Sequence, residues 1–128
     1  MRALRAILLG ILIWILIFVE VSVFRIGFKI TGLVGHIIHY VFLIVFTILG
    51  VIIYYKKRYK FNGFVLGIFL LLVGNILDLI ITIPLFTAKQ YANLSAAYAG
   101  FYSDIYLWIG FLIVVLVAGI YDLARKKR

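Results

Sequence analysis

Four long apolar segments, separated by short polar or basic connections, dominate the pattern along the chain. Each approaches or exceeds the roughly 20 residues that an α-helix needs to cross a hydrocarbon layer about 30 Å thick. The pattern therefore predicts four membrane-spanning helices, at residues 6–24, 32–55, 61–86 and 101–121. Because the connections are too short to fold separately, we expect an all-α, polytopic four-helix bundle that forms one transmembrane domain over residues 1–128.

The first segment follows a basic start, which is also typical of a cleaved signal peptide. Its apolar run is longer than that of a signal peptide, and no small-residue cleavage site precedes Arg25 and Lys29. We expect this segment to remain as a membrane span.

The composition supports a membrane protein and excludes several kinds of chemistry. Hydrophobic residues make up 67% of the chain and charged residues 13%, a balance typical of polytopic membrane proteins. Cysteine is absent, which excludes disulfides, thiolate metal ligands and thiol catalysis. No phosphate-binding glycine loop, zinc-protease helix or nucleophile elbow occurs. The sequence therefore predicts neither an enzyme nor a cofactor.

The basic residues predict the orientation in the membrane. Of the 13 lysines and arginines, ten flank the spans on one side, at 2, 5, 56–58, 60 and 125–128. Such residues concentrate on the cytoplasmic side, so we expect both termini to be cytoplasmic. The net charge of +9 then reflects topology and attraction to anionic lipid. Membrane lipid, and not nucleic acid, is the partner that it indicates.

Polar side chains recur at one depth in the predicted spans. Counted from the cytoplasmic basic residues at 1.5 Å per helical residue, six of them lie roughly 22 to 32 Å away: Glu20, His36, His39, Asn75, Asp78 and Asp104. A charge at the membrane centre costs about 2.5–3.5 kcal/mol on insertion scales, so such groups usually face the bundle or water. We expect an outward-facing cluster from all four spans. Asp78 as a hydrogen-bonded helix pin, and Asp104 as a solvated boundary residue, are the structural alternatives.

Glycines and one proline add packing signals. The third span carries Gly63, Gly67 and Gly74 in a stripe about 60° wide that ends in Asp78, and the second carries Gly32, Gly35 and Gly50 on the face of its histidines. Small residues on one face let helices approach closely, so we interpret both stripes as helix-packing faces. Pro84 lacks a backbone donor and predicts a kink or a helix end beyond Asp78.

His36 and His39 share one helical face because they are three residues apart. With Glu20, Asp78 or Asp104 they would form a nitrogen and oxygen site suited to zinc or a related divalent ion. Histidines that bond to neighbours or water are the interpretation we favour. In the longest connection, Asn93, Leu94 and Ser95 match a glycan acceptor triplet, which we interpret as part of an ordinary polar loop.

Three stretches, "LLGILIWILIFVEVS", "ILDLIITIPLF" and "LWIGF", resemble small four-span membrane proteins of archaea and bacteria. The resemblance implies a four-helix membrane protein, in a prokaryotic plasma membrane, in which Asp78, Pro84 and Trp108 belong to the shared pattern. It implies no activity.

Two functional hypotheses follow from the residues. In the first, the protein is a small channel or transporter for a cation or proton: Asp78 and Glu20 carry charge, His36 and His39 relay protons, and Asn75 orients the ion. In the second, it is a structural or accessory subunit whose glycine faces dock a larger membrane complex. Because the two halves show no internal repeat, we expect any transport symmetry to come from a homo-oligomer.

Overall fold

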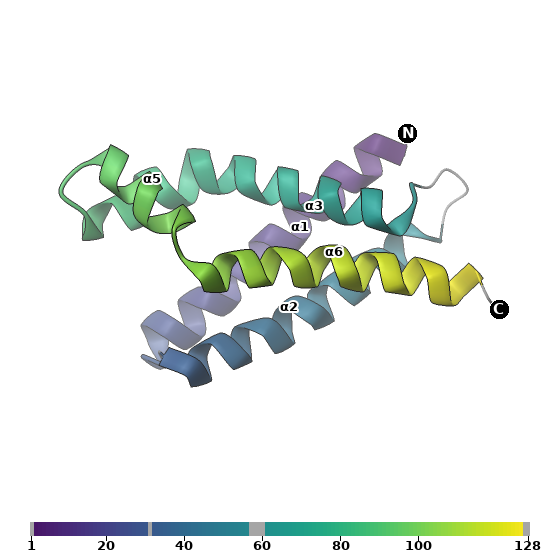
Figure 1. Ribbon diagram of the computed structural model, residues 1–128, viewed down its shortest axis with the longest axis horizontal. Coiled ribbons are helices and arrows are strands. Elements are labelled where there is room, and N and C mark those ends of the chain that lie inside the picture. Colours follow the sequence, from purple (N-terminus) through teal and green to yellow (C-terminus); the bar gives the residue numbers. More distant parts are fainter. Residues whose placement is uncertain (1, 31, 57–60, 127–128) are drawn as a thin grey trace.

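The computed structural model describes residues 2–30, 32–56 and 61–126, and within them it contains helices and no strand (Figure 1). Four of the helices are long: α1 (Arg2–Val21), α2 (Gly32–Tyr54), α3 (Gly63–Leu77) and α6 (Ile105–Lys126). A π-helix, η1 (Ser22–Gly27), continues α1. Beyond α3 follow a π-helix, η2 (Asp78–Thr82), and the single turn α4 (Ile83–Leu85).

The prediction of four membrane-spanning helices is confirmed at the level of helix length and hydropathy. The helical stretches long and apolar enough to cross a membrane are Ala3–Arg25, Gly32–Tyr54, Gly63–Leu85 and Ile105–Lys126. Their lipid-facing sides are rich in exposed Leu, Ile and Val, as a hydrocarbon environment requires.

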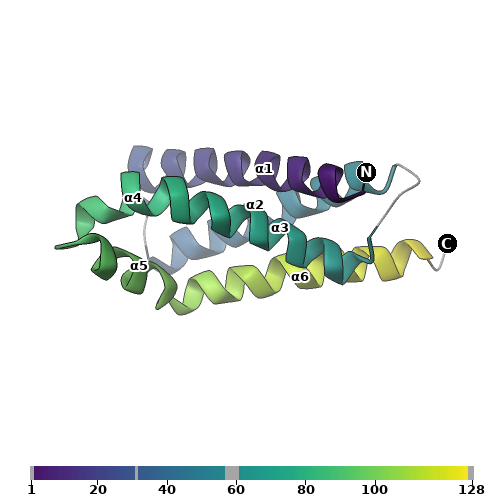
Figure 2. The ribbon, with the colours of Figure 1, turned by 90° about the horizontal axis from the view of Figure 1, so that it is seen from above.

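The four long helices form a ring in which α1 neighbours α2, α2 neighbours α6, α6 neighbours α3, and α3 neighbours α1 (Figures 1 and 2). We call the end that holds Arg5, Lys56 and Arg125 the tail end; α1 begins there and α6 ends there (Figures 1 and 2). The opposite end holds η1, the 3-10 helix η3 (Thr87–Gln90) and the short helix α5 (Leu94–Tyr102), and we call it the cap end.

The buried core occupies the tail half and the middle of the bundle. It consists of Ala6, Leu9, Ile13, Leu43, Val51, Tyr54, Tyr55, Leu66, Leu70, Val114 and Ala118. Toward the cap end, the pair α1 and α2 diverges from α3 and α5 (Figure 1). The tail half is therefore closely packed, whereas the helices of the cap half stand further apart.

Close backbone contact between α3 and α6 holds the tail half together. A Cβ atom at Gly67 would lie 2.8 Å from the Cα of Val115, and one at Gly63 would meet the carbonyl oxygen of Ala118. The backbone N–H of Gly63 also donates to the carboxylate of Asp122 at 2.9 Å. That carboxylate is 1% exposed and pairs with Arg125 and Lys126. The start of α3 is thus anchored by packing and by charge.

The two predicted glycine stripes are partly wrong. Gly50 packs against Ile13 of α1, but an added Cβ at Gly74 would meet no atom within 4 Å. The atoms nearest to a Cβ at Gly35 belong to Ile30, in the connection that precedes α2. Gly32 has a φ of +71°, a conformation that favours glycine, so it serves the turn into α2 and not a helix contact.

The predicted start of the fourth span at residue 101 is also wrong. Phe101 belongs to α5, which begins where Asn93 Oδ1 accepts the N–H of Ala96. The chain breaks at Ser103, and Asp104 Oδ1 accepts the N–H of Tyr106 at the start of α6. The membrane-spanning helix therefore begins at Ile105, after an Asp in a capping position. The acceptor triplet at Asn93 is accounted for locally by helix capping.

A pair of glycine substitutions tests the α3–α6 contact. Gly67→Ala places a methyl group against the backbone of α6 and should lower the free energy of unfolding by about 1–3 kcal/mol. Gly74→Ala meets no atom and should raise it by about 0.5–1 kcal/mol, because alanine favours a helix more than glycine does. Reversible denaturation in detergent measures both. Equal destabilisation by the two variants would show that both faces are packed.

Candidate functional site

A cavity of about 540 Å³ lies among the helices at the cap end. Its floor is formed by four buried residues of the core, one from each long helix: Ile13, Leu43, Leu70 and Val114. Most of its wall is apolar or aromatic. The polar residues that line it are Ser22, Arg25, His36, His39, Tyr40, Asn75, Asp78, Thr82, Thr87, Gln90, Tyr91, Asp104 and Tyr106.

Asp78 is the cavity residue with the most specific environment. The indole N–H of Trp14, from α1, donates to Asp78 Oδ1 at 2.9 Å, and the hydroxyl of Thr82 donates to the same oxygen at 2.8 Å. Within the described part of the chain, the second oxygen, Oδ2, accepts no hydrogen bond. One oxygen is therefore fixed by the protein, and the other is left for water or a ligand.

The position of Asp78 follows from the local sequence. Pro84 has no N–H to bond to Ile80, and its ring disfavours a regular α-helical turn there. The helix widens instead, and the N–H of Ile83 donates to the carbonyl of Asp78, five residues earlier. Thr82, one turn beyond Asp78, can then reach back to its carboxylate. The helix ends soon after, since α4 stops at Leu85. Single π-turns of this kind frequently occur at functional sites.

Asn75 joins α3 to α5. Its amide nitrogen donates to the carbonyl of Leu71 at 2.7 Å, and its Oδ1 accepts the hydroxyl of Tyr102 at 2.9 Å. Burial, and then the negative charge of Asp78, raises the pKa of Tyr102, which keeps its hydroxyl a donor at neutral pH. Protein groups thus engage both ends of the amide, and the geometry favours a role in holding α5 in place.

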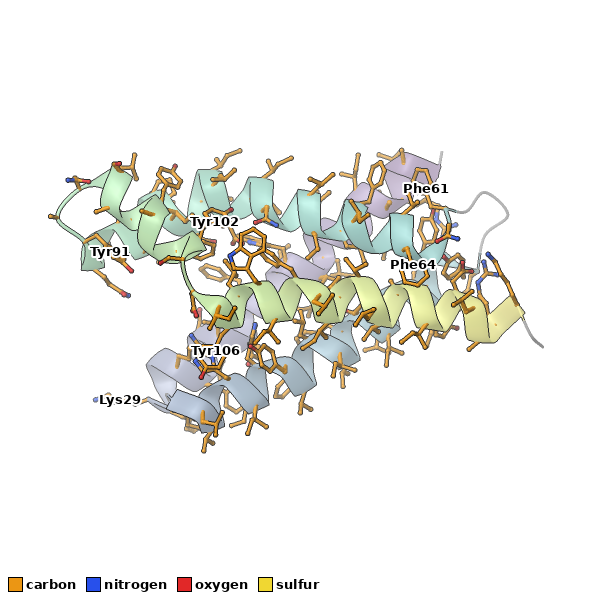
Figure 3. All side chains as sticks on the ribbon, in the orientation of Figure 1. Lys29, Phe61, Phe64, Tyr91, Tyr102 and Tyr106 are labelled. Carbon is orange, nitrogen blue, oxygen red and sulfur yellow. The ribbon has the colours of Figure 1, made fainter. Side chains whose placement is uncertain are left out.

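The histidines diverge from each other, although they share a helical face. His39 Nδ1 lies 2.9 Å from Glu20 Oε2, and Glu20 is buried, with 6% of its surface exposed. Glu20 does not line the cavity, so its link to the cavity runs through His39. His36 instead accepts from Arg25 at 3.0 Å and stacks on the ring of Tyr106 at 3.7 Å between centroids. Figure 3 labels Tyr106 at the start of α6, facing α2.

The predicted cluster residues other than Glu20 line this one cavity. Their hydrogen bonds are separate, however: Asp78 bonds to Trp14, His39 to Glu20, and His36 to Arg25. Among the described residues, no three His, Cys, Asp or Glu side chains gather closely enough to hold a metal ion. The interpretation of His36 and His39 as joint metal ligands does not fit this geometry. Asp104 is exposed and caps α6, as expected of a solvated boundary residue, and it also lines the cavity.

Sequence reasoning missed Trp14 and Arg25 as parts of the site. Trp14 carried a signal, because an indole N–H within a membrane span needs an acceptor from another helix. In the sequence, Arg25 only follows the first apolar segment, whereas in the structure it lines the cavity and its guanidinium donates to His36.

Comparisons with known proteins return no match: no family model, no curated protein and no solved structure is similar to this chain. The geometry of the cavity therefore carries the functional interpretation.

The hydrogen bond between Glu20 and His39 predicts how substitutions at Glu20 change the free energy of unfolding. Glu20→Leu removes the buried carboxylate that pairs with the partly buried imidazole of His39 and should lower the free energy of unfolding by about 1–3 kcal/mol. Glu20→Gln retains an acceptor oxygen and should cost less. Asp104→Asn, at an exposed position that keeps its capping oxygen, should change stability by less than about 0.5 kcal/mol. Denaturation in one detergent compares the three variants. A larger loss for Asp104→Asn than for Glu20→Leu would contradict the described environments.

Proposed function

We propose that the protein is a small membrane transporter for a cation or proton, and that Asp78 is the group that takes up the charge. The observation that carries this proposal is the unengaged Oδ2 of a carboxylate at a cavity deep within a membrane-spanning bundle. Ionisable side chains within membrane spans commonly mark ion or proton pathways.

A carrier fits the bundle better than an open channel does. Below the cavity floor, Val51, Leu66 and Ala118 have no exposed surface, and Thr47 and Tyr54 are equally buried. An ion at the cavity thus meets a closed, mainly apolar barrier toward the tail end. Release on that side requires the helices to move, which is the defining step of alternating access. We include a homo-oligomer in the proposal, because a symmetric partner can supply the second half of such a movement.

The pairs beside Asp78 have separate roles in this proposal. His39 lines the cavity and passes protons to or from the buried carboxylate of Glu20, its hydrogen-bonded partner. Arg25, held by His36, places a positive charge on the cavity wall and limits the number of cations that the cavity accepts together.

The accessory-subunit alternative has less support from the packing. It relied on glycine faces to dock a partner, yet Gly63 and Gly67 lie against α6, and Gly50 lies against α1. These contacts are made within the chain.

The proposed orientation places both termini in the cytoplasm of a prokaryotic cell and the cap end outside, because most basic residues lie at the tail end. The chain has no cysteine, so one introduced thiol reports one position. Ser95→Cys, in α5, should react with an impermeant thiol reagent in intact cells, and Tyr59→Cys, which falls outside the described residues, should not. Labelling of Tyr59→Cys alone would reverse the orientation.

Flux measurements test the role of Asp78. Asp78→Asn keeps the size and an oxygen acceptor for Trp14 but cannot titrate, so it should assemble normally and lose at least about 90% of cation or proton flux in proteoliposomes. Lys89→Gln, which removes an exposed charge outside the cavity lining, is the control and should retain flux. Undiminished flux in a folded Asp78→Asn variant would remove this carboxylate from the mechanism.

A further inference from the structure

An aromatic wall adjoins Asp78. The rings of Trp14 and Phe18 lie 5.3 Å apart between centroids, and those of Phe18 and Phe86 lie 5.1 Å apart. All three residues line the cavity, as Asp78 does. Because Trp14 also donates its N–H to Asp78, the carboxylate and the first ring of this wall are fixed relative to each other. Negative charge and π-faces thus occur together at one site.

Such a wall is poorly suited to a bare inorganic cation. Ca²⁺ and Mg²⁺ take about six or more oxygen ligands in proteins, and oxygens are scarce beside Asp78. The Thr82 hydroxyl donates to the carboxylate itself, and Asn75 Oδ1 accepts from Tyr102. An ammonium ion with apolar substituents does not need several oxygen ligands. Aromatic faces and one negative charge stabilise it.

The size and lining of the cavity agree with an organic ligand. Its volume of about 540 Å³ lies within the range of small-molecule sites, roughly 300–1,000 Å³, which are mostly apolar with a few placed polar groups. A single small ion would leave most of this space empty and would not contact the apolar wall. A ligand with an apolar body and one charged group would contact both the apolar wall and Asp78.

We propose that the cation which this cavity binds is an amphipathic organic ammonium ion, with its charged nitrogen at Asp78 and its apolar group along Trp14, Phe18 and Phe86. This inference rests on the proposed function to the extent that Asp78 is the cation-binding group. Arg25, the cationic residue of the cavity, is already bound to His36, so the free carboxylate oxygen of Asp78 selects a cation over an anion.

Intrinsic fluorescence provides a direct binding experiment, because the chain has two tryptophans. Trp108 is 52% exposed and does not line the cavity, so Trp108→Phe leaves Trp14 as the only tryptophan, which excitation at the red edge of its absorption selects over tyrosine. Benzyltrimethylammonium, added to this variant in a neutral detergent, should change the Trp14 emission saturably. Trp14→Phe changes the site as well as the reporter, so it serves only to measure nonspecific quenching of Trp108 by the probe, which should not saturate.

Two further substitutions place the ligand within the cavity. In the Trp108→Phe background, Asp78→Asn should weaken benzyltrimethylammonium binding at least tenfold through loss of the counter-charge. Phe18→Leu keeps an apolar side chain and should weaken binding about two- to fivefold, as expected from one cation–π contact. Circular dichroism and size-exclusion chromatography establish that each variant is folded. Should Asp78→Asn fail to assemble, the Phe18→Leu result decides the test.

Other probes separate this inference from the proposed function. Benzenesulfonate, an anion with a similar aromatic body, should not bind, and excess Na⁺ or K⁺ should not displace the ammonium probe. Saturable binding of benzenesulfonate alone, or unchanged ammonium affinity in folded Asp78→Asn and Phe18→Leu variants, would overturn the inference. Asp78-dependent proton or K⁺ flux without ammonium binding would overturn it and leave the proposed function intact. Ammonium binding without any flux would support the inference and contradict transport.

Discussion

The direct approach of α3 to α6 at the tail end is the constraint on which the other features depend. Lipid tails are as apolar as leucine, so membrane helices associate through close packing and polar contacts and gain little from apolar burial alone. Here Gly63 and Gly67 bring the backbones together, and the ring of Phe64 lies against Gly119. Asp122 adds a charged anchor by accepting the N–H of Gly63.

The cap half of the bundle, beyond this closely packed tail half, contains the cavity. Near Gly74, α3 faces open space, because an added Cβ there meets no atom within 4 Å. The short helix α5 spans part of the resulting gap, held to α3 by the Tyr102–Asn75 and Tyr98–Leu79 hydrogen bonds. Figure 3 labels Tyr102 in α5, on the side that faces α3. Asp78, His36 and His39 then line a cavity, where water or a ligand can solvate them.

The carboxylates of Asp122, in the tail half, and Asp78, in the cap half, differ in the groups that balance their negative charge. Asp122, in the tail half, has two cations and a backbone donor, which is typical of a structural carboxylate. Asp78, in the cap half, has two neutral donors on one oxygen and no cation within the described residues. The second arrangement leaves a charge for a ligand to balance, and this difference supports a functional role for Asp78.

The sequence predicted the four apolar helices well, because apolar length is a property of each single helix. It did not predict which side chains meet, because contacts depend on how far each helix has diverged from its neighbour. Gly67 and Gly74 share one stripe, yet one is packed and the other faces open space. Phe101 reads as part of a span, whereas the Asp104 cap separates it from α6. The indole N–H of Trp14 indicated that an acceptor is needed, but only the structure identifies that acceptor as Asp78.

The accessibility of Gly74 tests the central claim, a cavity that opens at the cap end and is closed below. A cysteine at Gly74, the only thiol in the chain, should react in oriented vesicles with a small impermeant thiol reagent supplied on the cap side. A cysteine at Thr47, which is fully buried below the cavity floor, should react from neither side. Protection of the cysteine at position 74 from the cap side, or its reaction from the tail side alone, would contradict the account.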